Sequence, residues 1–228
     1  TTLTVTNSYN CMDSTSQAIE IYTLPNASFS ANNICEDSIV HFSNLSSINN
    51  GLITNYLWLF GNGNTSSLFE PSVLYVSENT YTVSLIAESD FGCTDTFVNQ
   101  LDVYPNPIAL FNFTDTCEGA PIGFTDLSIV SNTSTTNFIT NWNWNFNDNG
   151  AISTTQHPSY QFSQDGTYAV SLELTTNNNC THDTTLLVTA HPNPVVDFIS
   201  LNPFGCSEWC VDFQNNSSIN SGSIASFY

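Results

Sequence analysis

The sequence predicts an all-β protein built from repeated domains. A strand that ends in aromatic residues and an Asn/Gly turn occurs twice, at residues 58–63 and 144–150. Thr-Tyr-x-Val follows each copy, at residues 80–83 and 167–170. Apolar residues alternate with polar ones, and we find no stripe of helical period. Two copies of one pattern in the same context indicate a duplicated domain.

The alternation is clearest in residues 141–147, where Trp142, Trp144 and Phe146 are separated by asparagines. A period of two is typical of a strand with one face on a core and the other in water. The pattern returns at residues 81–87 and 168–174. We therefore expect sheets with one buried face.

Three Pro-Asn segments mark domain boundaries, at residues 24–26, 104–107 and 191–194. Proline excludes a central strand and Asn-Pro favours a turn, so each segment is predicted to be a short, stiff linker. A cysteine precedes each linker, and successive ones are 82 and 87 residues apart, a domain-sized period. The predicted layout is the end of one repeat, two whole repeats and the start of a fourth: 1–26, 27–106, 107–193 and 194–228.

The charge balance restricts the partners. The chain has 20 Asp and Glu, no Lys or Arg, and a formal net charge of −20 at pH 7. Binding to a phosphate backbone needs Lys or Arg, so this composition excludes a nucleic-acid surface and disfavours anionic membranes. The chain has no run of 18 apolar residues, so we expect no direct membrane insertion. Both ends fall in strand-like sequence, and we expect a section of a longer exported chain.

The repeated motif resembles the PKD (polycystic kidney disease) domain family over nearly the whole chain. The family's pattern is Trp-x-Phe-Gly-Asp-Gly, then Pro and an aromatic residue, then Gly-x-Tyr-x-Val. The chain departs from it at Asn62, which replaces the Asp, and at the enlarged turn 147–150. The two cysteines of each repeat further resemble repeats of very large secreted adhesins of gliding Bacteroidota-type bacteria. The matching residues are Trp58, Phe60, Gly61, Gly63, Pro71, Tyr75, Tyr81 and Val83, and then Trp144, Phe146, Gly150, Pro158, Phe162, Gly166, Tyr168 and Val170.

The resemblance implies tandem immunoglobulin-like (PKD-type) β-sandwich domains in an extended head-to-tail array. By analogy with other sandwiches, the Trp side chains pack between the sheets and the Tyr hydroxyls bond to the preceding turn. Trp142 shares a face with Trp144, and we expect it to be partly buried. The expected core markers are Trp58, Phe60, Tyr81, Trp144, Phe146 and Tyr168.

Seven cysteines in a secreted-looking array favour disulfides over metal sites. In the implied sandwich, Cys35 and Cys117 lie at one end of their repeats, and Cys93 and Cys180 lie at the other. A strand separates the two ends by about 23 Å, beyond the Cα distance of about 7 Å that a bridge allows. Bridges within a repeat, Cys35–Cys93 and Cys117–Cys180, are thus disfavoured unless the first strand is irregular. The end of one repeat meets the start of the next, so Cys35–Cys180 is the preferred pair.

The remaining cysteines have other expected partners. Cys210 follows Cys206 by four residues, and the two can close a local bridge. Cys11, Cys93 and Cys117 are expected to pair outside the fragment.

Leu57 and Leu59 interrupt the polar face of the first repeat. They alternate with Tyr56, Trp58 and Phe60, so they point outward, where the second repeat has asparagines. Outward leucines form either a shallow satellite patch or an interaction patch for a neighbouring strand or molecule.

No catalytic machinery is evident, and we expect no enzyme activity. The four His residues are scattered without metal-ligand spacing, and no Ser/His/Asp order or close carboxylate pair stands out. Calcium is the one candidate ion, because carboxylates and Asn carbonyls are hard ligands. Asp148 and Asn147 are the candidate ligands. No cofactor is required.

Three short triplets, Asp-Ser/Thr followed by a small or apolar residue, resemble the acceptor for O-glycosylation in Bacteroidota. The residues that would carry sugar are Ser14, Ser38 and Thr184.

The expected function is that of a structural spacer or shaft in a long extracellular surface adhesin or filament. The expected partners are neighbouring repeats of the same chain and other copies in a filament. Two alternatives stay open. The repeats could be polysaccharide- or protein-binding accessory modules of a secreted enzyme, or subunits that self-assemble laterally into a filament.

Overall fold

The computed structural model describes residues 1–131, 136–201, 204 and 211–226, and these residues form strands and no helix. The prediction of an all-β protein is confirmed. The described strands belong to two sandwiches and two terminal hairpins, and we describe each by itself. Within the described part of the chain, no helix is long and apolar enough to cross a membrane.

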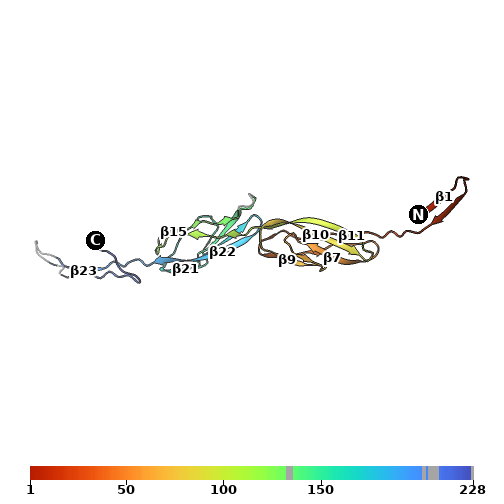
Figure 1. Cartoon of the computed structure of the whole chain (residues 1–228). Coiled ribbons are helices and arrows are strands. Elements are labelled where there is room, and N and C mark those ends of the chain that lie inside the picture. The colour runs from red at the N-terminus through yellow and green to blue at the C-terminus, as the bar shows by residue number, and fades with distance from the viewer. Residues whose placement is uncertain (132–135, 202–203, 205–210, 227–228) are drawn as a thin grey trace. The chain divides into compact units, whose positions relative to one another are not determined.

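The first sandwich comprises strands β3 to β11. Its larger layer is a five-stranded sheet, in spatial order β4 (Ile34–Cys35), β11 (Thr94–Tyr104), β10 (Asn79–Ser89), β7 (Ile53–Leu59) and β8 (Thr65–Ser66). The other layer consists of two antiparallel pairs, β3 (Phe29–Ser30) with β6 (Ser43–Asn44) and β5 (Ser38–His41) with β9 (Ser72–Tyr75). The long strands β10 and β11 lie side by side in Figure 1.

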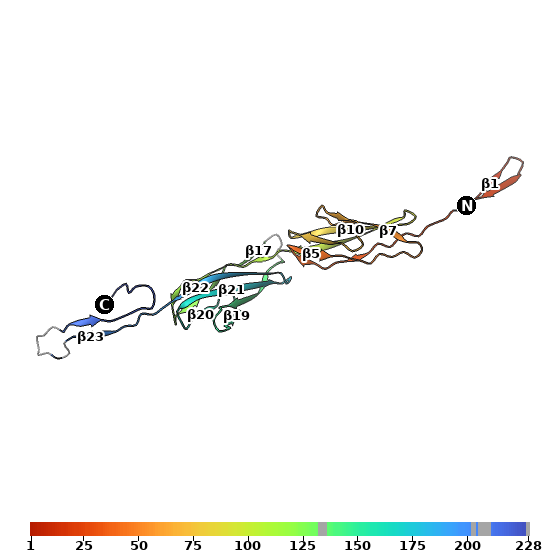
Figure 2. The same cartoon turned by 90° about the horizontal axis from the view of Figure 1, so that it is seen from below.

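The second sandwich comprises strands β12 to β22 and repeats this plan. Its five-stranded sheet has the order β14 (Thr116–Cys117), β22 (Thr181–His191), β21 (Gly166–Thr176), β18 (Ile139–Asn145) and β19 (Ile152–Ser153). Its other layer consists of β13 (Phe111–Asn112) with β16 (Thr125–Asp126), β15 (Pro121–Gly123) with β20 (Ser159–Gln161), and β12 (Pro107–Ile108) with β17 (Ile129–Val130). Figure 2 shows β21 beside β22 from a second direction.

Each terminus carries a short antiparallel hairpin. At the N-terminus β1 (Thr2–Thr6) pairs with β2 (Met12–Ser16), and near the C-terminus β23 (Phe198–Ser200) pairs with β24 (Phe213–Asn215). Their apolar side chains are exposed, because neither hairpin has a second layer against it in the described residues.

The two cores follow from the alternation in the sequence. From Val83 onward in β10 and from Val170 onward in β21, every second residue is buried, while the residues between them face outward. Burying one face in this way removes apolar surface from water at about 25 cal/mol per Å², the main favourable term in folding. The largest fully buried side chains are Trp58, Trp144, Tyr75, Phe42, Phe60, Phe124, Phe146, Phe162, Leu85, Ile122, Leu172 and Leu174.

Candidate functional site

The two core tryptophans are structural. Trp58 and Trp144 are fully buried, and each indole N–H donates to a loop carbonyl 2.9 Å away, that of Leu68 and that of Thr155. A buried indole needs such a partner. With Phe60 and Phe146 also buried, the predicted core positions are confirmed, and these side chains cannot contact a ligand.

The motif tyrosines fasten their strands to the preceding turns. The Tyr81 hydroxyl donates to the Ser77 carbonyl at 2.9 Å, and the Tyr168 hydroxyl donates to the Gln164 carbonyl at 3.0 Å. Both side chains are half-buried at the edge of their core. The predicted hydroxyl tie is confirmed in both sandwiches.

The cysteines of the described part of the chain fall into two chemical states. Cys35 and Cys180 are disulfide-bonded, whereas Cys11, Cys93 and Cys117 are free thiols. Bridges within a repeat, Cys35–Cys93 and Cys117–Cys180, are therefore absent, and the finding supports the predicted Cys35–Cys180 bridge. The suggested local pair, Cys206–Cys210, lies outside the described residues.

The linker that leaves the second sandwich is tied to the loop after Cys117. The Glu118 carboxylate accepts the backbone N–H of Asn193 and that of Asp165, each at 3.0 Å. The Asn193 side chain donates to the Glu118 carbonyl at 3.0 Å, and the Glu118 N–H donates to the His191 carbonyl at 2.7 Å. Hydrogen bonds to a charged acceptor are the stronger kind. The linker is therefore held by the domain and does not behave as a free chain.

The strand that enters each sandwich is fastened near the opposite hairpin. In the first sandwich the Ala27 N–H donates to Asp95 at 2.8 Å, and in the second the Ala109 N–H donates to His182 Nδ1 at 3.1 Å. Asp95 and His182 are equivalent positions, two residues after Cys93 and Cys180. Both sandwiches thus fix the incoming chain at the same place with different side chains.

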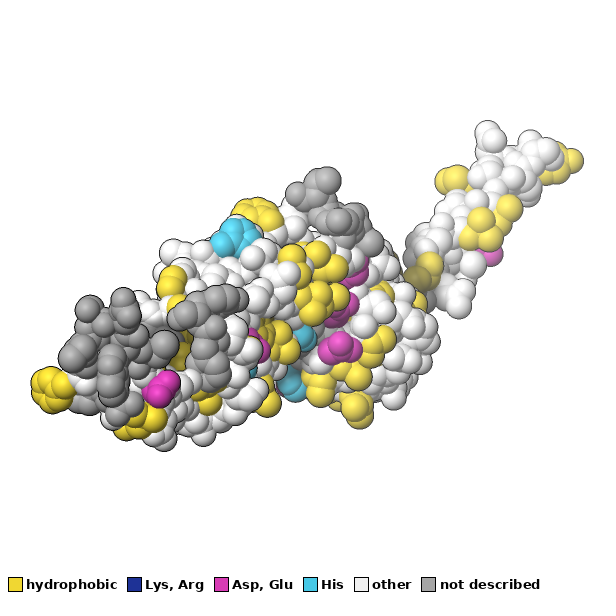
Figure 3. Space-filling view, turned by 90° about the vertical axis from the view of Figure 1, so that its left-hand side faces the viewer, with side chains coloured by type: hydrophobic (Ala, Val, Ile, Leu, Met, Phe, Trp, Pro, Cys, Tyr) yellow, Lys and Arg dark blue, Asp and Glu magenta, His cyan; other side chains and the backbone are white. Residues whose placement is uncertain are grey.

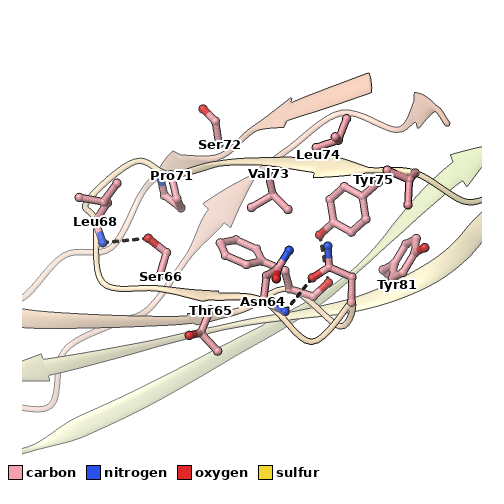
Figure 4. Close-up of a pocket in the computed structure, with 13 residues that line it drawn as sticks. Asn64, Thr65, Ser66, Leu68, Pro71, Ser72, Val73, Leu74, Tyr75 and Tyr81 are labelled. Carbon is pink, nitrogen blue, oxygen red and sulfur yellow. Dashed lines mark hydrogen bonds between the residues drawn. The ribbon is translucent and has the colours of Figure 1, made fainter. Parts of the chain in front are cut away.

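A hollow of about 550 Å³ opens in the first sandwich beside the motif turn. Figure 4 shows Val73 pointing toward it and Ser72 pointing away, as the period of a strand requires. The Tyr75 hydroxyl donates to the Phe60 carbonyl at 3.0 Å. Burial raises the pKa of Tyr75 to about 12, so that hydroxyl keeps its proton at physiological pH.

The second sandwich fills the corresponding space with its own side chains. Tyr160 stands where Val73 stands in the first repeat, and its ring stacks on Phe146 with centroids 4.2 Å apart. Its hydroxyl donates to Asp148 at 2.9 Å, and the other Asp148 oxygen accepts from Asn149 at 2.8 Å. Burial, followed by the bond to Asp148, raises the pKa of Tyr160.

These contacts bear on the calcium candidates. Both carboxylate oxygens of Asp148 are already hydrogen-bonded, and Asn147 is an exposed residue with φ of 50°. Among the described residues, no group of three His, Cys, Asp or Glu side chains could hold a metal ion. Calcium therefore stays a prediction that rests on ligand chemistry alone.

A buried polar position distinguishes the two sandwiches. Asp126 is 8% exposed and accepts from the Trp142 indole at 2.7 Å, Gln156 at 3.0 Å and the Ser128 N–H at 3.0 Å. Burial acts to raise the pKa of Asp126, but the hydrogen bonds from Ser128, Gln156 and Trp142 outweigh it and leave that pKa below its usual value. Trp142 is half-buried, as predicted.

The first sandwich has Asn44 at this position. Its carbonyl oxygen accepts the Ser46 N–H at 3.0 Å, like the equivalent Asp126 oxygen. Its Nδ2, however, is buried without a hydrogen-bond partner. Tyr56 replaces Trp142 here and packs edge-on against Phe69, so no side-chain donor or acceptor takes the place of the indole.

The predicted leucines do point outward. Leu57 is 43% exposed and Leu59 is 40% exposed on the outer face of β7. Leu57 lies opposite Ile86 on β10, and Val98 on β11 continues the row that starts at Leu59. We call Leu57, Leu59, Ile86 and Val98 the outer leucine face.

The equivalent positions of the second sandwich are polar. Asn143 lies opposite Glu173 and donates to its carboxylate at 3.1 Å, and Asn145 lies opposite Ser171. The outer leucine face is therefore a property of the first sandwich and is not required by the fold.

Surface charge is uniform in sign. Figure 3 shows carboxylates scattered among uncharged side chains on the visible face, and the chain has no Lys or Arg to pair with them. Of the suggested glycosylation sites, Ser14 is exposed, whereas Ser38 and Thr184 are half-buried. Glycosylation at these sites stays a prediction.

The sequence reasoning missed Glu118, Asp126 and His182 as fastening residues. A usable signal existed for Glu118, because Cys-Glu occurs at the same place in both repeats, at 35–36 and 117–118. His182 had no such signal, because its counterpart is Asp95. Its role depends on a backbone N–H that only the folded chain brings to it.

Comparison with known families identifies the repeat. A family model described as PKD domain matches residues 22–103 and 105–190. No curated protein matches the chain. PKD and immunoglobulin-like domains are typical non-catalytic modules of extracellular or surface proteins, although some belong to enzymes, and no catalytic family matches.

Several solved structures are similar to parts of the chain. The PKD1 domain of Vibrio anguillarum Epp is 34% identical, with 36% of this chain and 99% of that domain covered and a TM-score of 0.33. The PKD1 domain of the Vibrio cholerae metalloprotease PrtV is 31% identical, with 36% and 98% covered and a TM-score of 0.31. A solved chain from a 1.5-MDa bacterial ice-binding adhesin is 13% identical, with 77% of this chain and 66% of that solved chain covered and a TM-score of 0.38.

Proposed function

This chain belongs to the PKD domain family, in two tandem immunoglobulin-like sandwiches, and on that premise we propose that it is a stiff spacer. It would form part of the shaft of a long extracellular adhesin or filament and hold a binding end away from the cell. Its partners would be neighbouring repeats and other copies, with no nucleic acid and no membrane insertion. Tandem PKD domains suggest an extracellular structural or adhesin-like module.

The observation that carries the proposal is the fastening of chain segments at both ends of a sandwich. The outgoing linker is bonded through Asn193 to Glu118, and the incoming strand is bonded at Ala109 to His182. A flexible linker needs a backbone free of such bonds. If the domains moved freely about their linkers, we would not expect the residues next to each linker to be hydrogen-bonded to the sandwich.

The disulfide cysteines extend the argument. We propose that Cys35 and Cys180 are bonded to each other, so that the bond joins one repeat to the next. The 144 residues from 36 to 179 would then lie inside a covalent loop. At about 3.5 Å per extended residue, the loop contains about 500 Å of chain. A force applied at the termini would be carried by the disulfide and would not stretch this part of the chain. The residues inside the loop could then not add to the length of the shaft, even if its domains unfold.

Backbone amide relaxation measured by NMR tests the stiffness. If the spacer is stiff, both sandwiches tumble as one elongated body and give one set of anisotropic correlation times. Replacing Cys35 and Cys180 with Ser should let the sandwiches tumble more independently, while Cys11→Ser, a free thiol elsewhere, should not. Separate short correlation times for the two sandwiches in the unmodified protein would contradict the proposal.

The outer leucine face favours a second candidate function, lateral self-assembly. Four apolar side chains lie next to one another on neighbouring strands of the first sandwich, at positions where the second sandwich has polar residues. Light scattering should show concentration-dependent association that Leu57→Asn with Leu59→Asn abolishes. A protein that stays monomeric at all concentrations would contradict a role of this face in assembly.

The hollow of the first sandwich favours the accessory-module alternative. Asn62, Asn64 and Thr65 supply polar groups beside apolar side chains there, a combination that suits an uncharged polymer. A pull-down on insoluble polysaccharide discriminates, because a pure shaft stays in the supernatant. Retention that Val73→Tyr reduces would favour this alternative.

A further inference from the structure

Three hairpins of the chain are built in the same way, each around a cysteine. In the first, the Asn7 N–H donates to the Cys11 carbonyl at 3.0 Å. Ser89 donates to Cys93 in the same way, and Thr176 to Cys180, each at 2.9 Å. The side chain of Asn7, Ser89 or Thr176 also accepts the N–H of the cysteine, and the residue before each cysteine has positive φ. The three hairpin cysteines are therefore structural equivalents.

Two further cysteines form a second equivalent set. Cys35 ends β4 and Cys117 ends β14, the outermost short strands of the two five-stranded sheets. A glutamate follows each, and then a residue of positive φ, Asp37 or Gly119. We call Cys35 and Cys117 the loop cysteines.

Each set contains one disulfide-bonded member and at least one free thiol. Cys180 is bonded and Cys93 is free among the hairpin cysteines, and Cys35 is bonded and Cys117 is free among the loop cysteines. The bonded members show that a cysteine in each of these two settings takes a disulfide. The free members have the same local backbone and lack only a partner.

We propose that Cys117 of one copy of this chain forms a disulfide with Cys93 of a second copy, which links copies head to tail. The inference rests on the proposed Cys35–Cys180 pairing, because it repeats that loop-to-hairpin pairing between molecules. Cys117 is exposed and Cys93 is half-buried, so both sulfur atoms can be reached. Cys93 is preferred over Cys11 because, like Cys180, it closes a hairpin that belongs to a complete five-stranded sheet.

The chemistry is thiol–disulfide exchange with a small-molecule disulfide as oxidant. The Cys117 thiol loses its proton to solvent, and the thiolate attacks one sulfur of the oxidant and releases one small thiolate. The Cys93 thiolate then attacks the Cys117 sulfur of this mixed disulfide and releases the second small thiolate. Two protein thiols are oxidised to one disulfide, and one small disulfide is reduced to two thiols.

Charge sets the conditions for this reaction. Each copy carries a net charge of −20, and carboxylates such as Asp95 and Glu118 lie within two residues of the reacting cysteines. Two copies therefore repel each other, and no Lys or Arg offsets the repulsion. At physiological ionic strength, salt screens the repulsion between exposed charges that lie more than about 8 Å apart. Disulfide formation between two copies should therefore become faster as the salt concentration rises.

The test is oxidation of the protein in a glutathione redox buffer, followed by a non-reducing gel and mass spectrometry. Peptides come from a protease that cleaves after Asp and Glu, because the chain offers trypsin no site. We expect a ladder of covalent oligomers and a cross-linked peptide that contains Cys93 and Cys117. Cys93→Ser alone and Cys117→Ser alone should each reduce the ladder at least tenfold. Mixing these two variants should restore dimers only.

Matched controls separate the outcomes. Cys11→Ser and a Cys206→Ser/Cys210→Ser double variant should keep the ladder, because neither removes a reacting thiol. A monomeric chain that contains the Cys35–Cys180 peptide would overturn this inference and leave the proposed function standing. A ladder that survives in Cys93→Ser or Cys117→Ser would also overturn it. Absence of the Cys35–Cys180 peptide would instead contradict the pairing in the proposed function.

Discussion

The two sandwiches share a core and differ around it. Trp58 and Trp144 occupy the same buried site with the same kind of hydrogen bond. The second sandwich fills its hollow with Tyr160, where the first has Val73 and an open space. The repeated motif therefore determines the buried interior of both sandwiches. The residues at the rim of the core and on the outer faces differ between the two. Functional differences between repeats should be sought there.

Removing the shared tryptophan should have the largest effect, and an equal one in both sandwiches. Trp58→Ala or Trp144→Ala leaves a large cavity and should cost about 3–5 kcal/mol of the affected sandwich's stability. Hydrogen exchange resolved by sandwich, as a function of denaturant, measures each loss separately. A variant that loses less than about 1 kcal/mol would show that the two cores are not equivalent.

A substitution in the motif turn should affect the stability of the two sandwiches differently. Gly61 has φ of 76°, and a Cβ placed on it would lie 2.7 Å from the Thr82 carbonyl oxygen. Gly61→Ala should therefore destabilise the first sandwich by about 1–3 kcal/mol, through strain and the forced shift of backbone. The equivalent residue, Asn147, already has a side chain in the enlarged turn. Asn147→Gly is the matched control, expected to change the free energy of unfolding by less than about 1 kcal/mol in the same exchange experiment.

The buried carboxylate should make the second sandwich the more acid-sensitive one at this position. The folded-state pKa of Asp126 lies below its usual value, because hydrogen bonds from Ser128, Gln156 and Trp142 outweigh the effect of burial. Its stabilising contribution is therefore present above the unfolded pKa of about 3.9 and is lost as pH falls through the lower folded pKa. Asn44 does not titrate, so the first sandwich lacks this dependence.

Asp126→Asn tests this difference directly. It should cost about 1.5–3 kcal/mol at neutral pH, since it removes a charged acceptor from the Trp142 and Gln156 donors. The loss should shrink as pH falls below the usual Asp value and through the lowered folded pKa of Asp126, because the carboxylate of the folded, unmodified protein then takes up a proton. Unfolding free energies measured from pH 7 to pH 2 check both points. A cost that does not change with pH would mean that the charge of Asp126 is not what stabilises the site.

The outer leucine face should contribute least to stability. Leu57→Asn with Leu59→Asn changes only exposed side chains, so the free energy of unfolding should shift by no more than about 0.5 kcal/mol per site. Asn143→Leu with Asn145→Leu creates the same face on the second sandwich and is the matched reverse. Thermal unfolding of both double variants measures the effect. A large loss in the first would mean that these leucines are part of the core.

The predictable part of the molecule is the part that the motif repeats. Strand alternation, the buried tryptophans and the tyrosine ties all follow from residues present in both copies, because burial imposes the same pattern twice. The outward orientation of the two leucines was also predictable from the sequence, because the two-residue period of a strand assigns each residue to one face of the sheet. Glu118 was signalled only by the repeated Cys-Glu pair, and Asp126 and His182 were not predictable, because the Trp142 indole and the Ala109 N–H reach them only in the folded chain.

The hollow was equally hidden from sequence reasoning. It exists because Val73 is smaller than Tyr160 and because the turn at Gly61 is one residue shorter than its counterpart. Neither residue carries a chemical signature of a site. Only the two sandwiches together show that one space is filled and the other is not.

Single-molecule pulling from the two termini tests the central claim most directly. With the Cys35–Cys180 bond intact, rupture of the sandwiches should release almost none of the residues 36–179. Adding a reductant should release about 500 Å more chain, the extended length of this loop. The same long extension with and without reductant would contradict the account of the chain as an inextensible spacer.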